Sequence, residues 1–363
     1  MRSLLVLLLF VLLLPANDLK TCQSCHPIIY QEFTQSMHQK SIPKKDPIHQ
    51  AIWQKHPAHA KGEYTCAKCH APQTSSPDPE HGITCISCHT IIDIKEHPHA
   101  NENIYESKDK TLYSAQKGME NQKITYEEKS SWFGLVKTSK GSPYHDIDYR
   151  NKGFYTGAVC MGCHSHKQNN KGFDLCRIDA KGASNTQENC ISCHMPKVQG
   201  STTTIQESRT HAFHGFAGVH VAPKMLAKYL DLAYQKNDQN FTITIHNRAP
   251  HPLLSHPLRE VILKVRYKHQ GKWQTLPIHT FKKVIGDQGK PSMPWLATET
   301  IQDNMIQANE RRTIPFDKTL TQGDEIEINI GYHIVNPKTA QKLKIDPKFS
   351  EFIPLKRSYY KIP

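Results

Sequence analysis

Residues 189–198 read NCISCHMPKV, and the two cysteines and the histidine in this stretch recur as a unit along the chain. Cys190 and Cys193 stand three positions apart, and His194 follows the second cysteine directly. Four other stretches have the same CxxCH spacing, and the five together contain ten of the eleven cysteines. They are Cys22, Cys25 and His26; Cys66, Cys69 and His70; Cys85, Cys88 and His89; and Cys160, Cys163 and His164.

The histidine after the second cysteine separates these motifs from other chemistry of paired cysteines. Redox dithiols, zinc sites and disulfides use closely spaced cysteines, but none of them needs a histidine at that position. Attachment of c-type haem does, because two thioethers hold one edge of the porphyrin and the next residue then lies beneath the iron. The sequence therefore predicts five covalently bound c-type haems, whose proximal iron ligands are His26, His70, His89, His164 and His194.

The composition agrees with an interior that is not built from side chains alone. Only 37% of the 363 residues are hydrophobic, and the mean hydropathy is -0.60. That is a thin supply of core for a chain of this length. We expect five large apolar rings to fill the interior, to lie close enough to pass electrons to one another, and to be required for folding.

The first residues resemble an export signal. Met1-Arg2 precedes an apolar run from Leu4 to Leu14, and small residues follow at 15–17. An apolar run of this length is too short for a membrane-spanning helix, which needs about 20 residues. We expect a signal peptide at residues 1–16 and a periplasmic protein; an uncleaved signal that attaches the protein to the membrane is the alternative.

The chain is basic, with a formal net charge of +13. Five haems at about −1 each would leave about +8, so anionic partners are favoured. These are an acidic redox protein, a small oxyanion or anionic headgroups. A quinol-linked membrane donor and an acidic or membrane-bound acceptor fit an exported redox protein, whereas nucleic acid is excluded by that location.

The second axial ligand of each iron must come from the other histidines, of which the sequence has 23 in all. Ile29, Phe33 and Met37 have helical spacing, and a helix from His26 to His38 would separate these two imidazoles by about 18 Å. His38 would then serve a haem other than the first. The candidates are His38, His97 or His99, His145, and His211 or His214, with His49, His56, His59 and His81 as further possibilities and His251 and His256 favoured as loop histidines.

The pattern of apolar residues divides the chain into two domains. Residues 17–238 contain all five motifs and predict an α and irregular multihaem domain, with a loop-and-hairpin insertion at 100–135 and a helix at 223–235. Strict alternation at 241–245, 261–267 and 326–332 predicts strands, and hence an all-β, sandwich-like domain at 239–363. The eleventh cysteine, Cys176, is interpreted as a buried free thiol, with a haem ligand or a reactive group near an open iron as the alternatives.

Several of these motifs, with their flanks, resemble multihaem cytochromes c. CQSCHPIIYQEFTQSMH, HGITCISCH and CMGCH are most similar to the tetrahaem cytochrome that accepts electrons from hydroxylamine oxidoreductase. CISCHMPK followed by HAFHGF resembles the closing haem segment of the group that contains pentahaem nitrite reductase and the octahaem enzymes. The resemblance covers residues 15–235 and is loose between the motifs.

The resemblance implies particular ligand pairs. His38 would face His89, and His99 or His97 would face His26. His70 would hold the haem without a sixth ligand, and so the one open to substrate. His145, and His211 or His214, would serve the fourth and fifth haems in either order. The CxxCK group of pentahaem nitrite reductase is missing, which disfavours reduction of nitrite to ammonia.

Two functions remain. The first is a periplasmic pentahaem cytochrome that carries electrons through closely packed, mostly bis-histidine haems between respiratory partners. The alternative is an oxidoreductase that acts on a small nitrogen or sulfur compound at one five-coordinate haem.

Overall fold

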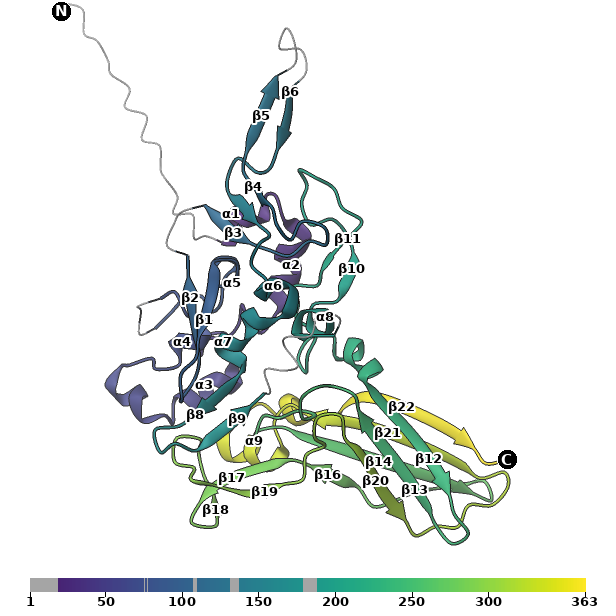
Figure 1. Ribbon diagram of the computed structural model, residues 1–363. Coiled ribbons are helices and arrows are strands. Elements are labelled where there is room, and N and C mark those ends of the chain that lie inside the picture. Colours follow the sequence, from purple (N-terminus) through teal and green to yellow (C-terminus); the bar gives the residue numbers. More distant parts are fainter. Residues whose placement is uncertain (1–18, 75, 77, 107–109, 131–136, 179–187) are drawn as a thin grey trace, which may run out of the picture.

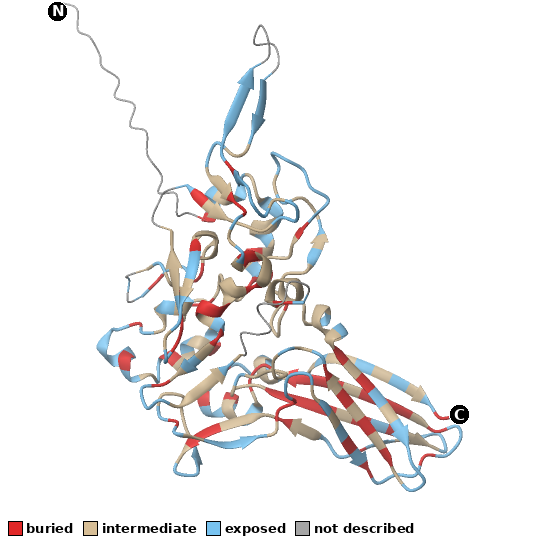
Figure 2. Cartoon of the chain, viewed as in Figure 1, coloured by how far each residue is buried: buried red, intermediate tan, exposed pale blue. Residues whose placement is uncertain are grey.

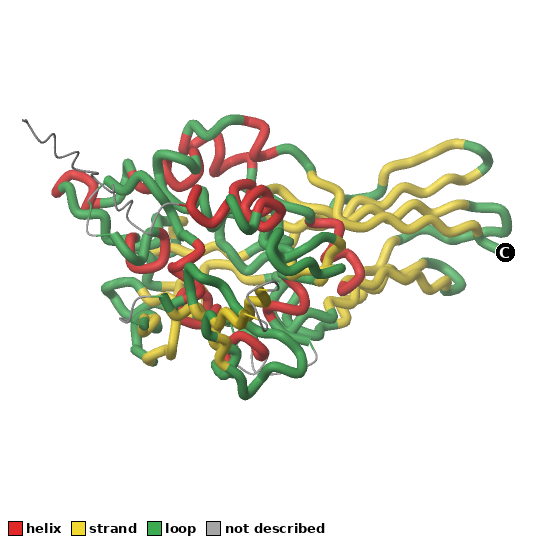
Figure 3. The backbone as a smooth tube through the Cα atoms, turned by 90° about the horizontal axis from the view of Figure 1, so that it is seen from above, coloured by secondary structure: helices red, strands yellow, loops and turns green. Residues whose placement is uncertain are grey.

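The computed structural model describes residues 19–74, 76, 78–106, 110–130, 137–178 and 188–363. The expected signal peptide at 1–16 lies outside the described residues. We call residues 19–229 the N-terminal region and residues 230–363 the C-terminal region. Most helices gather in the first, whereas the long strands of the second extend away from it (Figures 1 and 3). No helix of the described ranges is long and apolar enough to cross a membrane.

The helices are short, and six of the α-helices carry or adjoin a CxxCH motif. The α-helices are α1 (Leu19–Gln23), α2 (Pro27–Gln35), α3 (Pro47–Trp53), α4 (Ala67–His70), α5 (Cys85–His89), α6 (Gly153–Thr156), α7 (Met161–His164), α8 (Cys190–His194) and α9 (Pro337–Leu343). The 3₁₀ turns are η1 (Pro57–Lys61), η3 (Ala158–Cys160), η5 (Pro223–Tyr229) and η6 (Pro347–Ser350). The predicted helix after the first motif is present, but it ends before His38.

The predicted helix at 223–235 is wrong in its second half. The chain makes the 3₁₀ turn η5 and then enters strand β12 (Leu230–Lys236). From Leu230 to Leu232 the residues alternate between buried and half-buried, and all of β12 pairs with β13 (Phe241–Asn247). This pairing buries the leucines in a sheet, so the segment forms a strand although its apolar spacing also fits a helix. The C-terminal sheets therefore start earlier than residue 239.

Small sheets accompany the helices in the N-terminal region. Its strands are β1 (Ile91–Lys95), β2 (Glu102–Tyr105), β3 (Thr111–Tyr113), β4 (Lys123–Ile124), β5 (Glu127–Ser130), β6 (Lys137–Lys140), β7 (Asp146–Asp148), β8 (His166–Gln168), β9 (Asp174–Arg177), β10 (Lys197–Gln199) and β11 (Thr210–Ala212). Strands β5 and β6 form an exposed hairpin that projects from the molecule (Figure 1). The expected loop-and-hairpin insertion is therefore present.

Two antiparallel sheets build most of the C-terminal region. One has the order β12-β13-β20, and the other β15-β14-β21-β22 with β16 beside β14. The three segments with strict alternation form β13, β14 and β21, as predicted. The further strands are β14 (Glu260–His269), β15 (Lys272–Thr275), β16 (His279–Phe281), β17 (Lys283–Asp287), β18 (Lys290–Pro291), β19 (Glu299–Asp303), β20 (Arg311–Phe316), β21 (Glu325–His333) and β22 (Ile353–Lys361).

These two sheets share one hydrophobic core. Phe241 and Ile243 from the first sheet join Leu263, Ile328 and Ile330 from the second, and each of these side chains is fully buried. The buried residues follow one another along the C-terminal strands in Figure 2. The sandwich-like arrangement that we predicted remains an interpretation of this packing.

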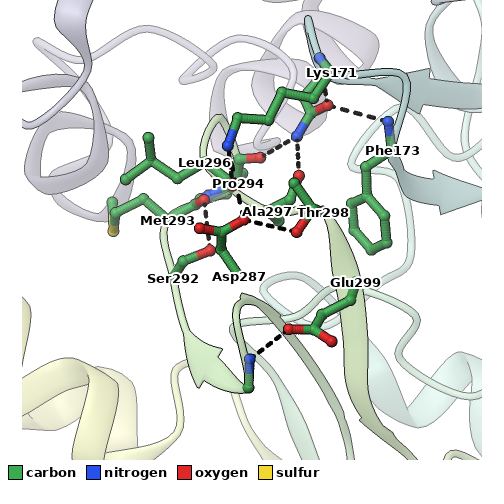
Figure 4. Close-up of polar contacts among 12 residues, drawn as sticks. Lys171, Phe173, Asp287, Ser292, Met293, Pro294, Leu296, Ala297, Thr298 and Glu299 are labelled. Atoms are coloured by element: carbon green, nitrogen blue, oxygen red, sulfur yellow. Dashed lines mark hydrogen bonds and ion pairs between the residues drawn. The ribbon is translucent and has the colours of Figure 1, made fainter.

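The two regions are joined by apolar and polar contacts. Ile48 of α3 packs in a cluster with Tyr332 and with Leu343 of α9. The buried Asn169, in the loop between β8 and β9, donates hydrogen bonds to the carbonyls of Pro294 (2.9 Å) and Ala297 (2.7 Å). Beside it the ammonium group of Lys171 donates to the carbonyl of Leu296 over 3.0 Å (Figure 4). The C-terminal region is thus held at the edge of the segment that carries the fourth motif.

Candidate haem-binding site

Each motif forms one tight helical turn. The backbone N–H of His26 donates to the carbonyl of Cys22 over 2.9 Å, and that of His70 donates to Cys66 over 3.1 Å. Asn189 caps the fifth motif by accepting from the N–H groups of Ile191 and Ser192. Thr84 caps the third in the same way through Ser87. Capping stabilises these two turns, and in all five motifs the turn brings two thiols and one imidazole together.

All five motifs open into one cavity of about 4220 Å³. Ordinary ligand pockets measure roughly 300–1,000 Å³, and protein interiors are close-packed. The cysteines and the histidine of every motif lie in its wall. The size and the lining of this cavity fit several large planar groups, one attached at each motif.

Four of the motif histidines face a second histidine across this cavity. Two iron–nitrogen bonds of about 2.0 Å, plus about 1.1 Å from each nitrogen to its ring centre, would place the two ring centres roughly 6.3 Å apart. The observed separations match this value. They are 6.3 Å for His26 and His145, 6.3 Å for His89 and His214, 6.0 Å for His194 and His251, and 5.9 Å for His38 and His164.

Most of these rings are also oriented for coordination. The Nδ1 atoms of His26, His89 and His194 lie 2.6–2.7 Å from the carbonyl oxygens of Thr202, Tyr113 and Ala217. Nδ1 of His214 lies 2.7 Å from the carbonyl of Ala212, and Nδ1 of His251 lies 3.0 Å from that of Pro252. A carbonyl at Nδ1 requires the proton there and leaves the Nε2 lone pair free for a metal.

Burial favours the neutral form, which is the form that binds iron, in several of these imidazoles. Desolvation lowers the pKa of His38 to about 3 and that of His214 to about 4, and the charges of neighbouring imidazoles add to both shifts. Desolvation is also the largest cause of the lowered pKa of His89, His164 and His194. Nδ1 of His38 is buried and has no hydrogen-bond partner among the described residues.

His70 differs from the other four motif histidines. No described imidazole lies opposite it at the spacing of the four pairs. The ring of His49 is 4.5 Å away, but Nδ1 of His49 and Nδ1 of His70 both contact the carbonyl of Ser41, over 2.7 and 2.8 Å. Two rings bound to one oxygen lie side by side, so His49 is on the same side as His70 and does not face it.

The structure does not bring together the pairs that the resemblance implies. His38 lies against His164, and the ring that faces His89 is His214. His145 faces His26, whereas His97 and His99 do not line the cavity. His214 is held in place by Glu32 of α2, which accepts a hydrogen bond from its backbone N–H over 2.8 Å.

Three other predicted candidates have partners that occupy their ring atoms. His211 is fully buried, with Nδ1 at 3.0 Å from the carbonyl of Gly200 and Nε2 at 3.0 Å from the carboxylate of Glu32. His56 accepts from the N–H of Ala58 at Nδ1, and its ring stacks on Trp53. His59 packs edge-on against the same tryptophan, and neither it nor His81 lines the cavity.

Sequence reasoning favoured His251 as a loop histidine, but the structure places it opposite the fifth motif. It lies between β13 and β14, in a segment without periodicity, and nothing in the spacing connects it to His194 more than fifty residues earlier. The sequence signal for His251 was the proline on either side of it, Pro250 and Pro252, because prolines stiffen the backbone that positions the ring. The contact makes the C-terminal region part of the site.

The motifs also contact one another through their cysteines. The thiol of Cys22 interacts with that of Cys85, Cys69 with Cys163, and Cys160 with Cys190; each contact raises the pKa of one thiol in the pair, namely Cys85, Cys163 and Cys160. The charge of Cys88 acts on both Cys160 and Cys163. A Cβ at Gly157, whose φ is +80°, would lie 3.0 Å from Cβ of Cys190, so only glycine permits this approach of the fourth and fifth motifs. The thiol contacts connect motif one to three and motif four to both two and five, while motif three acts on motif four through the charge of Cys88.

The cysteines show no sign of another role. None of the eleven forms a disulfide, and no group of three or more His, Cys, Asp and Glu side chains that could bind a bare metal ion occurs in the described ranges. Cys176 lies on β9 in the wall of the cavity, and burial raises the pKa of its thiol. The interpretation of Cys176 as a structural thiol stays a prediction.

Comparison with known proteins agrees with this geometry. The family described as cytochrome c554 and c-prime matches residues 21–90, which contain the first three motifs. The crystal structure of a penta-heme cytochrome c552 from Thermochromatium tepidum is similar over 94% of this chain and 98% of that one, with a TM-score of 0.68 and 21% sequence identity. A search of curated proteins gives no match. Five CxxCH turns on one cavity, the family match over the first three motifs and the shared fold all support a multihaem c-type cytochrome with five covalently bound haems.

Proposed function

We propose that the protein is a periplasmic electron carrier in which four haems have histidine on both faces of the iron. The proposed pairs are His26 with His145, His89 with His214, His164 with His38, and His194 with His251. Two imidazoles per iron give a low-spin centre that exchanges electrons without binding substrate. The spacing of the four ring pairs supports this assignment.

The proposal of electron transfer rests on the contacts between cysteines of different motifs. Each thioether holds one porphyrin edge, so cysteines that touch bring the edges of two haems together. An electron entering at the first haem would pass through the Cys22–Cys85 contact to the third, and from there to the fourth, whose cysteines feel the charge of Cys88. From the fourth haem it passes to the second or to the fifth.

The location and the partners follow from chemistry and from charge. Multihaem c-type cytochromes are typically exported, and the apolar segment at residues 4–14 fits an export signal. With about +8 of net charge after haem attachment, the surface favours an acidic acceptor, and a quinol-linked membrane protein is the proposed donor. These partners would exchange electrons at haems near the surface, and the first motif is next to the exposed Ile205.

Light-driven electron injection tests whether the five haems form one connected path for electrons. A ruthenium photoreductant attached to Ile205→Cys, in a Cys176→Ser background, should reduce the first haem and then the others within milliseconds of a flash. Ile205 and Tyr359 are equally exposed, at 55%, so the same label on Tyr359→Cys, far out in the C-terminal sheet, is the matched control and should reduce haem much more slowly. Reduction confined to a single haem would refute the proposed electron path between the haems.

A second function is favoured by His70. Because no ring among the described residues faces it, the haem of the second motif would keep one axial position open. An open iron with four electron-carrying haems beside it can bind a small nitrogen or sulfur compound and exchange electrons with it. The protein would then be an oxidoreductase whose other haems supply or remove electrons. Binding of added ligands to this haem alone separates this function from that of a pure carrier.

A further inference from the structure

A group of basic side chains lines the cavity at the end where His70 lies. His256 and Arg259 belong to one turn before β14, closed by a hydrogen bond of 2.9 Å from the N–H of Arg259 to the carbonyl of His256. His220, from the segment before η5, completes the group. The charges of Arg259, His70 and His220 all act on His256, and the adjoining residues Val219 and Leu258 pack in one apolar cluster.

Arg259 has no anionic partner in hydrogen-bond contact. Its guanidinium forms no hydrogen bond or ion pair within the described part of the chain. Burial lowers its pKa to about 10, while the charges of Tyr332 and Asp46 oppose this shift. Asp46 is already engaged, because its carboxylate caps α3 by accepting from the N–H of Ile48. Arg259 is half-buried in the wall of the cavity, and a charged guanidinium without a partner in such a place favours an anion beside it.

The tautomer of His256 marks it as a hydrogen-bond donor and not as an iron ligand. Its Nδ1 accepts from the backbone N–H of Leu258 over 3.2 Å, which places the proton of the neutral ring on Nε2. Most of the rings proposed as ligands have the opposite arrangement, with a carbonyl at Nδ1. Burial lowers the pKa of His256 to about 3, with the charge of Arg259 as the next cause, so the ring is neutral at pH 7 and donates from Nε2.

We propose that Arg259 and His256, supported by His220, form a binding site for a small oxyanion beside the open iron of the His70 haem. The inference rests on the proposed open position and adds the class of ligand that would fill it. An oxyanion could bind iron through one atom and accept hydrogen bonds from Nε2–H of His256 and from the guanidinium through others. Arg259 has donors only, and the one acceptor nitrogen of His256 is occupied by the N–H of Leu258, so cationic ligands are disfavoured.

A nitrite titration of the ferric holoprotein tests the site. Binding is measured by the loss of the high-spin haem signal in electron paramagnetic resonance. Arg259→Ala should raise the Kd for nitrite at least tenfold, because a charge-assisted hydrogen bond is lost. Carbon monoxide is neutral and binds the same iron in the ferrous state, so its affinity should change less than twofold. Arg248→Ala is the matched control: this arginine of the same region also lines the cavity, but it is paired with Asp231 and should leave both affinities unchanged.

The other outcomes are equally informative. An unchanged nitrite Kd in Arg259→Ala, with a shifted reduction potential, would mean that Arg259 only pairs with a haem propionate. Equal weakening of nitrite and carbon monoxide would mean general damage to the haem pocket. Either result overturns the inference, as would a new high-spin haem in His256→Ala, which would make His256 an axial ligand. If Arg259→Ala fails to mature, Arg259→Lys keeps the charge and should weaken nitrite binding less than tenfold.

Failure of this site can be separated from failure of the proposed function. A wild-type protein with one high-spin haem that ignores nitrite refutes the oxyanion site but leaves the open iron intact. A wild-type protein with five low-spin haems refutes the open iron itself, and the oxyanion site with it.

Discussion

The N-terminal and C-terminal regions are stabilised in different ways. In the C-terminal region two sheets enclose a continuous core that includes the fully buried Ile243, Leu263 and Ile328. The N-terminal region has more residues, but its only buried apolar cluster of the described ranges is small and is built around Ile42 and Trp53. Figure 2 shows this contrast, with buried residues concentrated along the C-terminal strands.

The difference shows where the few hydrophobic residues of the sequence are concentrated. The apolar side chains that a sheet needs are placed in the C-terminal region, and in the N-terminal region the haems take their place. Short helical turns are enough there, because each one has only to hold two sulfur atoms and an imidazole against a ring. The two regions nevertheless depend on each other, since His251 of the C-terminal region faces the fifth motif.

Removal of haem should give the largest difference between the two regions, because it should unfold the N-terminal region and leave the C-terminal sheets folded. We expect the full chain produced in a host that cannot attach haem to keep protected amides in β13, β14 and β21, while residues 19–229 exchange at once. The reason is that only the C-terminal sheets have a core of their own. Hydrogen exchange with mass spectrometry checks this. Protection of α2 and α5 in the haem-free chain would contradict the contrast between the regions.

A cavity in the C-terminal core should cost the next largest amount. Ile328→Ala removes a side chain with no exposed surface and should destabilise the C-terminal sheets by about 2–5 kcal/mol. The matched change is Ile86→Ala in the third motif, which lines the haem cavity and should alter haem absorbance while leaving the sheets unchanged. Exchange rates of β21 amides measure both. Equal effects on β21 would show that the two cores are not separate.

Loss of the proposed ligand from the C-terminal region should change one haem and little else. His251→Ala is expected to convert one low-spin haem to high-spin, because the fifth iron loses its second imidazole. Electron paramagnetic resonance of the ferric protein counts the change. His246→Ala, in the neighbouring strand β13 and beside Asp231, is the control and should leave all spin states as they were. An unaltered spectrum in His251→Ala would disprove its assignment as a ligand.

The polar junction in Figure 4 should make the smallest contribution. Asn169→Ala removes two hydrogen bonds to the carbonyls of Pro294 and Ala297 and leaves these acceptors unpaired, which should cost about 1–3 kcal/mol. Limited proteolysis between the regions should become faster. The exposed neighbour Asn170 provides the control, and Asn170→Ala should not change the rate of cleavage. A rate in Asn169→Ala equal to that of the control would show that other contacts hold the junction.

Local features of the fold were predictable from the sequence, and long-range ones were not. The CxxCH turns and the strands β13, β14 and β21 follow from spacing and alternation within a few residues. Leu230 and Leu232 fit a helix or a strand equally well, and only their pairing with β13 decides between them. The partner of each motif histidine depends on how distant segments meet, so His145 and His214 could be named as candidates but not matched to a motif.

The basic group near His70 had no sequence signal. Arg259 and His256 stand in a loop before a strand, and only the cavity shows that they meet the second motif. The absence of a ring opposite His70 was implied by resemblance, but the shared carbonyl of Ser41 explains why the nearby His49 does not fill that position.

The spin states of the five irons test the central claim most directly. Quantitative electron paramagnetic resonance of the oxidised holoprotein, with the haem content established by intact mass, should give four low-spin haems and one high-spin haem. Five low-spin haems, or two or more high-spin haems, would contradict the proposal that histidine pairs close four irons and leave the iron of His70 open.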